Sequence, residues 1–206
     1  MKNFKRLSTL FVASMAVFGF SACSSDNEME PEVPVSVEAK TISFVSSSTK
    51  EEDWEYFSFK QGKFVEVPKS KANEDLTWDI AFQRFYVRTN SGESGKGKGG
   101  ALDSGKKSFD EVTEVPKSGF ISDKIASVMA KMSVMVERSV NTAFEIEKHP
   151  SWMWFVFQEM RWAHNDNVFI VRLADGESYA KVIMRAYKND EGTSGHITFD
   201  YIYPFK

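Results

Sequence analysis

Short segments in which apolar and polar side chains alternate make up much of the chain after residue 40, and this period of two is typical of half-buried β-strands. The segments are residues 41–46, 54–59, 64–68, 76–89, 168–173, 179–187 and 195–203. Residues 174–177 join two of them, and the Asp-Gly pair in this tetrapeptide is a strong hairpin signal. The sequence therefore predicts an all-β domain of antiparallel sheets, either a sandwich or a curved open sheet.

Residues 122–140 fit two patterns at once. Apolar residues at positions 125, 128, 129, 132, 135 and 136 match the stripe of an amphipathic helix. If the segment is a strand, the even positions from 126 to 136 are all apolar, and the odd positions carry serine, lysine and the two methionines Met129 and Met135. The strand interpretation thus places thioethers on a face that is otherwise polar, where core packing does not explain a methionine. The pattern leaves both interpretations open.

The least periodic region is 141–166. Three tryptophans, two methionines and an arginine lie within eleven residues of it: Trp152, Met153, Trp154, Met160, Arg161 and Trp162. Such a cluster forms either part of the core or the rim of a flat apolar pocket.

Residues 78–101 combine an aromatic strand with a loop that holds five glycines among lysines and serines. A loop of this kind suggests an anion-binding site, so phosphate is the first ligand to test. A phosphate loop requires G-x-x-x-x-G-K-[ST] and a helix directly behind it. Gly92 and Gly97-Lys98 have the spacing, but Gly99 stands where the hydroxyl is required and no helical period follows. We therefore interpret the segment as a conformationally demanding surface loop that orders the adjoining sheet.

The amino terminus has the pattern of a bacterial lipoprotein signal. Lys2, Lys5 and Arg6 precede a mostly apolar run over residues 7–20. This run is shorter than the roughly 20 residues that span a bilayer, and it suits a cleaved signal. Ser21 and Ala22 precede Cys23, which is the only cysteine of the chain. We expect a signal peptide over 1–22 and a diacylglycerol on Cys23, so that the membrane is contacted through a lipid anchor only.

Removal of the signal changes the formal net charge from -3 to -6, because residues 1–22 contain three cations and no anions. An acidic chain without a basic stripe argues against nucleic acid as a partner. With one cysteine, the chain forms no internal disulfide. Residues 23–40 are polar, acidic and proline-bearing, which indicates a flexible tether. Residues 41–206 are the right length for one domain.

Several blocks of the sequence carry a resemblance to a known family. The segment WDIAFQRFYVRTNSGESGKGKGGA at 78–101 closely resembles the HmuY family of outer-membrane haem-binding lipoproteins from anaerobic Gram-negative bacteria. Blocks at 54–59, 115–120, 168–176, 180–182 and 197–206 agree in the same order. The match is weakest between residues 121 and 167.

The resemblance implies haem capture. It implies an all-β fold of antiparallel sheets whose long hairpin fingers form a ligand cleft, with haem (iron protoporphyrin IX) held by two axial histidines. A hemophore-like protein of this family takes haem from host carrier proteins and passes it to a TonB-dependent outer-membrane haem receptor. The implied location is the surface of the outer membrane, and the sequence leaves open whether the protein is also shed.

The chain departs from the family's ligands, because His149, His164 and His196 do not sit convincingly at the expected positions. Methionines crowd the same windows instead, and iron in haem accepts a thioether axially, which raises its reduction potential. We expect Met129 and Met160 to be the ligands and ferrous haem to be favoured. Alternatives are Met132 or Met135 for the first position, Met153 for the second, and a pair that includes His149 or His164.

Around such a site, Trp152, Trp154, Phe155 and Trp162 are candidate walls, and Arg161 or Lys131 are candidate propionate contacts. The alternative role for these tryptophans is ordinary core packing. We find no HExxH, no GxSxG and no recognisable catalytic histidine–carboxylate motif, so we expect no enzymatic activity. The spacing of Glu145, Glu147 and His149 is weak support for a metal site. The main alternative function is a structural or adhesive surface lipoprotein without a cofactor.

Overall fold

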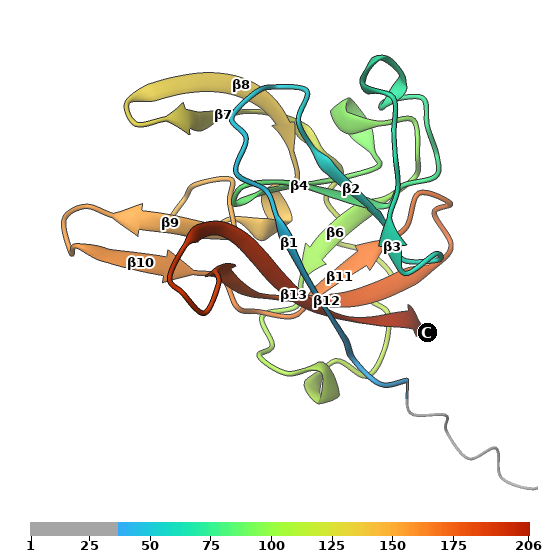
Figure 1. Ribbon diagram of the computed structural model, residues 1–206. Helices are drawn as coiled ribbons and strands as arrows, with labels where there is room; N and C mark the ends of the chain where they lie inside the picture. The colour runs from blue at the N-terminus through green and yellow to red at the C-terminus, as the bar shows by residue number, and fades with distance from the viewer. Residues whose placement is uncertain (1–36) are drawn as a thin grey trace, which may run out of the picture. The chain divides into compact units, whose positions relative to one another are not determined.

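The computed structural model describes residues 37–206, which form thirteen β-strands and four 3-10 helices (Figure 1). The expected signal peptide, Cys23 and most of the expected tether lie outside the described residues. Within the described residues no helix has the length and apolar character required to cross a bilayer. The all-β prediction is confirmed.

Two antiparallel sheets form the body of the domain. The first has the strand order β1-β13-β12-β11-β6, with β1 at Lys40–Val45, β13 at Ser194–Phe205, β12 at Tyr179–Lys188, β11 at Phe169–Arg172 and β6 at Gly100–Asp103. The second has the order β3-β2-β4-β5, with β3 at Lys63–Phe64, β2 at Glu55–Ser58, β4 at Ile80–Gln83 and β5 at Tyr86–Thr89. The 3-10 helices are η1 Lys69–Lys71, η2 Gly92–Ser94, η3 Phe109–Glu111 and η4 Thr142–Phe144.

Aromatic side chains from both sheets fill the space between them. Phe57 of β2 is fully buried, and its ring packs edge-on against Phe199 and Tyr201 of β13 at centroid distances of 5.4 and 5.5 Å. Phe82 of β4 stacks on Phe199 at 5.1 Å. Edge-to-face and offset contacts of this kind add to the free energy gained from burying the rings. The alternating aromatic positions of the sequence are therefore the inner faces of a sandwich.

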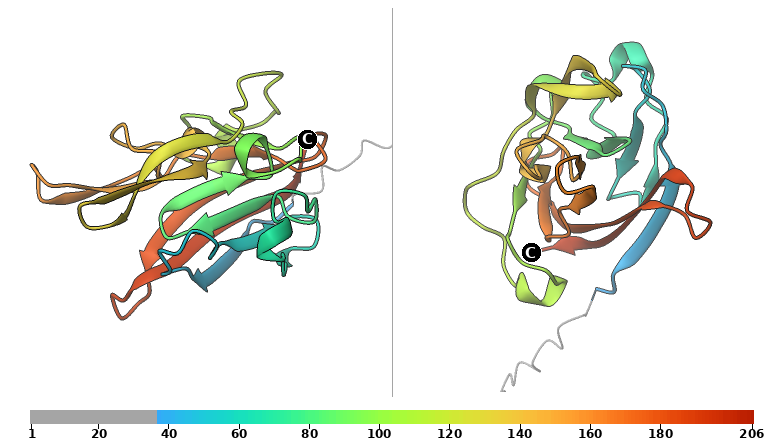
Figure 2. Two further views of the ribbon diagram at one scale, coloured as in Figure 1. Left: turned by 90° about the horizontal axis from the view of Figure 1, so that it is seen from above. Right: turned by 90° about the vertical axis from the view of Figure 1, so that its left-hand side faces the viewer.

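Two further hairpins project from one side of this body (Figure 2). Strand β7, Lys124–Lys131, pairs with β8, Val134–Val140, and strand β9, Met153–Val156, pairs with β10, Arg161–His164. We call them the first and the second hairpin. Residues 122–140 are thus a strand pair and not a helix, and the chain reverses at Ser133, whose φ is 61°.

The predicted long strand at 76–89 is wrong in one respect, because it is divided into β4 and β5. Arg84 between them has a φ of 54°, in the left-handed region that non-glycine residues rarely adopt. Its backbone N–H donates to the hydroxyl of Ser46 at 3.1 Å. Nothing in the local sequence marks this turn, since neither glycine nor asparagine occupies it.

The glycine-rich loop wraps around Asn90. The side-chain amide of Asn90 donates to the carbonyls of Asp75 and Trp78 at 2.7 and 2.9 Å, and its oxygen accepts from the N–H of Gly97 at 3.0 Å. A Cβ atom at Gly95 or Gly97 would collide with Asn90. The glycines therefore permit close approach of the backbone, which agrees with the interpretation of an ordering loop rather than a phosphate site.

A buried carboxylate fixes the root of the first hairpin. Asp123 directly precedes β7 and accepts hydrogen bonds from the backbone N–H of Thr89 at 2.9 Å, the Thr89 and Ser94 hydroxyls at 2.6 Å, and the Asn141 amide at 2.8 Å. Asn141 directly follows β8. Both ends of the hairpin are therefore attached to β5 and to the glycine-rich loop through one side chain.

Burial raises the pKa of Asp123 to about 6, although these hydrogen bonds oppose the rise. The folded protein therefore binds this proton more tightly than the unfolded chain, in which the pKa is near 3.8. We predict that the carboxyl's contribution to stability is largest below pH 4 and is lost as the pH rises through 6. Relative to Asp123→Asn, the free energy of unfolding of the wild type should fall by about 2 kcal/mol between pH 4 and pH 7.

Urea unfolding of both proteins from pH 4 to pH 8 measures this difference. Other titrating groups, including the buried Asp79, are present in both proteins and cancel. A difference that stays constant over this range would contradict the assignment of the titration to Asp123.

Candidate functional site

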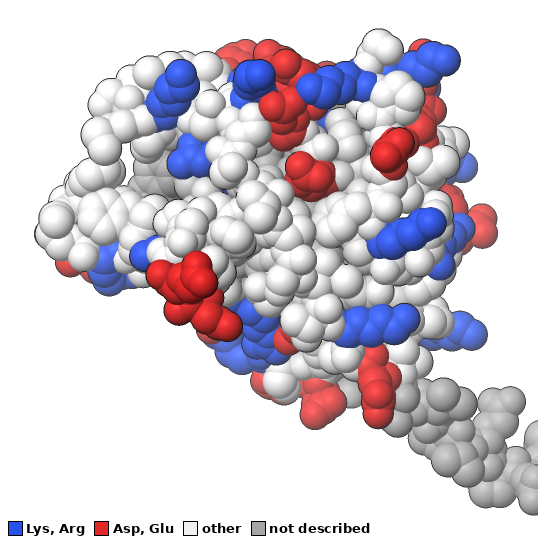
Figure 3. Space-filling model, in the orientation of Figure 1, with Lys and Arg blue, Asp and Glu red and all other residues white. Residues whose placement is uncertain are grey.

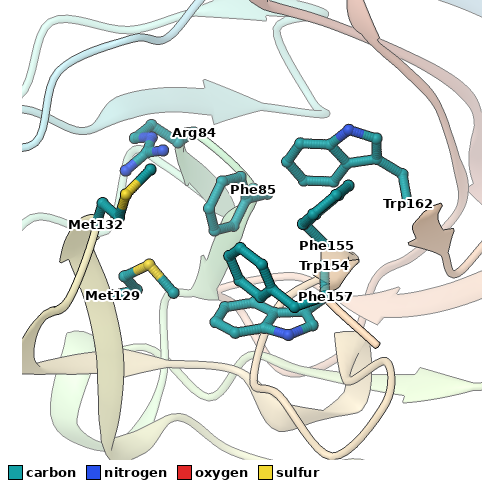
Figure 4. Close-up of a pocket in the computed structure, with 8 residues that line it drawn as sticks. All are labelled: Arg84, Phe85, Met129, Met132, Trp154, Phe155, Phe157 and Trp162. Atoms are coloured by element: carbon teal, nitrogen blue, oxygen red, sulfur yellow. The ribbon is translucent and has the colours of Figure 1, made fainter. Parts of the chain in front are cut away.

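An apolar cavity of about 330 Å³ lies between the two hairpins and the β4–β5 turn. It is lined by eight residues: Arg84, Phe85, Met129, Met132, Trp154, Phe155, Phe157 and Trp162 (Figure 4). The volume falls within the roughly 300–1,000 Å³ that is usual for small-molecule sites. Apart from the guanidinium of Arg84, every group that lines the cavity is aromatic or a thioether.

The second hairpin supplies an aromatic wall. Phe155 and Trp162 are cross-strand partners whose ring centroids are 5.3 Å apart, and Phe157 packs edge-on against Phe155 at 4.9 Å. Phe157 is nevertheless 56% exposed and Trp162 is 45% exposed. Exposed aromatic side chains that gather at a cavity are typical of a binding surface rather than of a core. Figure 3 shows that the hairpins form a largely uncharged part of the face it presents.

Met129 of the first hairpin is held through its backbone. The Tyr86 hydroxyl accepts from the N–H of Met129 at 2.8 Å and donates to its carbonyl at 3.3 Å. Tyr86 is itself buried, and this burial raises its pKa to about 12, so the phenol keeps its proton. Tyr86 therefore takes the place of a neighbouring strand at this position, and it leaves the thioether of Met129 to line the cavity.

The β4–β5 turn contacts both hairpins. A guanidinium nitrogen of Arg84 donates to the carbonyl of Ala130 in β7 at 2.9 Å. The carbonyl of Phe85 accepts from the N–H of Trp152, at the root of the second hairpin, at 3.2 Å. The ring of Phe85 is buried and lies between the methionines and the aromatic wall (Figure 4). This turn thus forms the floor of the cavity.

The five methionines that the sequence suggested as ligands lie in different environments. Met129 is half-buried and lines the cavity, and Met132, 81% exposed in the β7–β8 turn, lines it as well. Met135 is exposed opposite Met129, and Met153 is half-buried against the core. Met160 is 76% exposed in the β9–β10 turn, with a φ of 50°. Only Met129 and Met132 of these five are among the residues that line the cavity.

The histidines of the described chain do not line this cavity. His149 stacks on Trp154 at a centroid distance of 3.5 Å, and burial lowers its pKa. His164 is half-buried with an unpartnered Nε2, and burial lowers its pKa too. His196 lies on β13. Residues 37–206 contain no group of three or more histidine, cysteine or acidic side chains suited to a metal ion, so Glu145 and Glu147 form no such group with His149.

The supporting residues of the site are partly those that the sequence indicated. Trp154, Phe155 and Trp162 line the cavity, but Trp152 is fully buried in the core. Arg161 lies outside the lining and pairs with Glu147 and Glu159.

Sequence reasoning missed Arg84, Phe85 and Phe157. The first two were hidden inside an apparent continuous strand. The third stands in the same aromatic cluster as Trp154, so its signal was present but not separable from core packing.

Comparison with known proteins agrees with this architecture. Two solved structures share the fold: an HmuY-like heme binding protein from Bacteroides vulgatus, with 26% identity and a TM-score of 0.63, and the apo HmuY analog of Tannerella forsythia, with 25% identity and a TM-score of 0.56. The matches cover 83% and 82% of this chain, and 94% and 98% of the other chains. No curated protein matches the sequence significantly.

The model of the HmuY protein family matches residues 50–201, which include both sheets' central strands, the glycine-rich loop and both hairpins. Together with the all-β fold and the hairpins that enclose an apolar cavity, this match shows that the chain belongs to the HmuY family.

Proposed function

We propose that this protein is a haem-binding surface lipoprotein, similar to a hemophore, whose ligand lies in the cavity between the two hairpins. The observation that carries the proposal is the cavity itself, in which an aromatic wall faces thioethers across an open apolar space. A porphyrin is flat and apolar and needs walls of this kind. The Bacteroides vulgatus relative is described as a heme binding protein, which supports the same ligand class here.

The residues that line the cavity fit haem chemically. Trp154, Phe155, Phe157 and Trp162 offer flat surfaces for the macrocycle, and thioether sulfur is an accepted axial ligand of haem iron. Neutral sulfur ligands favour the ferrous state relative to imidazole, so we propose that the site prefers reduced haem.

We propose Met129 and Met160 as the axial pair. Two axial ligands must approach the iron from opposite faces of the ring, and Met129 and Met132 lie together on one side of the cavity (Figure 4). The second ligand should therefore come from the second hairpin. Met160 is 76% exposed in the turn of that hairpin, whereas Met153 is packed against the core.

The wider role is also a proposal. The lipid on Cys23 would keep the protein at the surface of the outer membrane, where haem is taken up from host carriers and passed to a TonB-dependent receptor. An open cleft between two projecting hairpins suits such a role, because the ligand can enter and leave without unfolding of the two-sheet body.

The first test is a titration of the purified protein with haemin, followed in the Soret band with and without dithionite. We expect binding in both states and a dissociation constant at least tenfold lower for reduced haem. An absence of spectral change in both states would remove the haem proposal and favour a structural or adhesive lipoprotein.

The second test replaces the methionines one at a time by alanine. Met129→Ala and Met160→Ala should each weaken ferrous haem binding by about tenfold or more and change the ferrous spectrum. Met135→Ala is the matched control, because Met135 is the cross-strand partner of Met129 but does not line the cavity. If Met132→Ala rather than Met129→Ala changes the spectrum, the first ligand is Met132. A ferrous spectrum that survives both Met129→Ala and Met160→Ala would rule out our pair.

A third test addresses the position of Met129. Tyr86→Phe removes the hydroxyl that binds the N–H and the carbonyl of Met129 and leaves the buried ring in place. We expect the free energy of unfolding to fall by about 1–2 kcal/mol and ferrous haem affinity to fall several-fold. In a double-mutant cycle with Met129→Ala, the effect of Tyr86→Phe on haem affinity should largely vanish. Additive effects would show that Tyr86 does not act through Met129.

A further inference from the structure

We infer that Arg84 binds a carboxylate of the ligand and thereby sets the orientation of the ligand in the cavity. This inference deepens the proposed function and rests on it. It adds a residue that recognises the carboxylate side chains of the macrocycle, in place of Arg161, which does not line the cavity.

Arg84 is the only charged residue among the eight that line the cavity. Within residues 37–206 the eight ion pairs of the structure do not include Arg84, so no described carboxylate offsets its charge. One guanidinium nitrogen is used on the carbonyl of Ala130, and the remaining N–H groups have no described partner. A positive group with free donors therefore stands at the edge of an apolar space.

The guanidinium is also held in place. It lies over the ring of Phe85 with 4.7 Å between its central carbon and the ring centroid, and the bond to Ala130 fixes one of its nitrogens. The backbone of Arg84 is fixed in turn by the bond from its N–H to Ser46. Little side-chain freedom is left to lose when an anion binds, which favours a tight and directional contact.

Because the rest of the cavity is apolar, the anion that binds Arg84 must be part of a largely apolar ligand. A ligand that fills the space between Met129 and the aromatic wall removes water from Arg84. An entirely apolar ligand would leave a desolvated cation without a partner, which is costly. A ligand with a carboxylate at its edge offsets that cost, because the guanidinium fork matches a carboxylate in a bidentate pair. Arg84 is bonded to Ala130, the residue after Met129. The distance between the bound carboxylate and the iron-binding thioether would therefore be fixed.

The test separates the two ends of the ligand by using three porphyrins. Haemin has iron and carboxylates, protoporphyrin IX has carboxylates without iron, and haemin dimethyl ester has iron without free carboxylates. Binding of each, measured by quenching of tryptophan fluorescence, is compared in wild type, Arg84→Gln and Met129→Ala. Trp154 and Trp162 line the cavity and report on all three ligands.

Arg84→Gln should lower the affinity for haemin and for protoporphyrin IX by about tenfold each, as expected for the loss of a charge-assisted hydrogen bond. Its affinity for haemin dimethyl ester should equal that of the wild type. Met129→Ala should lower the affinity for haemin and for its dimethyl ester, which contain iron, but not the affinity for protoporphyrin IX, which does not. If no porphyrin binds to the wild type, the proposed function fails. If all three bind and Arg84→Gln weakens the ester as much as haemin, the inference about Arg84 fails while the function stands.

Two further variants exclude simpler explanations. Arg161→Gln removes the same charge from the second hairpin at a residue that does not line the cavity, so it controls for general attraction of an anionic ligand. Arg84→Lys keeps the charge without the fork and should recover part of the haemin affinity. Equal losses in Arg84→Gln and Arg161→Gln, or no recovery in Arg84→Lys, would overturn the inference.

Discussion

The cavity depends on the tight turn at Arg84 and Phe85. From this turn, one side chain bonds to β7 in the first hairpin, and one carbonyl accepts from the root of the second hairpin. A two-stranded hairpin is marginally stable on its own, so both projecting hairpins need an attachment to the body of the domain. The turn provides it for both at the same place. Its left-handed backbone is unfavourable for arginine, and the bonds that it makes to Ser46, Ala130 and Trp152 offset that cost.

The first hairpin is attached a second time at its root through Asp123 and Asn141. A buried carboxylate is stabilising only when its hydrogen-bonding capacity is satisfied, and here hydroxyls, an amide and a backbone N–H supply the donors. The roots of the hairpins are therefore fixed, whereas their turns carry exposed apolar side chains such as Met132 and Met160. A rigid root with adaptable thioethers at the tip is suited to closing around a flat ligand, because methionine adapts its side chain without movement of the backbone.

The sequence predicted those elements in which one physical signal dominates. Alternating apolar and aromatic positions identified most strands of the two sheets, and Asp-Gly identified the turn before β12. Strand β6 was missed, because it begins at Gly100, inside the segment interpreted as a glycine-rich loop. The pattern did not predict the structure where the periods of a helix and of a strand coincide, as in residues 122–140. It also missed the turn at Arg84, because arginine is unusual at such a position. For the site, Met129 and Trp162 could be selected by chemistry, but Arg84 could not, because it joins them only through the fold. The opposite error occurred at Trp152, two residues before Trp154: its chemistry suggested a wall of the site, but its ring is fully buried in the core.

Charge places a further limit on how this site can work. The formal net charge is -3 for the full chain and -6 without the expected signal peptide, so the long-range field of the protein does not attract an anionic porphyrin. The lysines of the glycine-rich loop do not supply local attraction either, because they lie outside the cavity lining and Lys96 pairs with Glu74. If the chain binds haem as proposed, its affinity would then come from burial of the macrocycle and from contacts inside the cavity. In such a water-poor environment one positioned cation has more effect than several on the surface, which is the physical reason for assigning the carboxylate contact to Arg84.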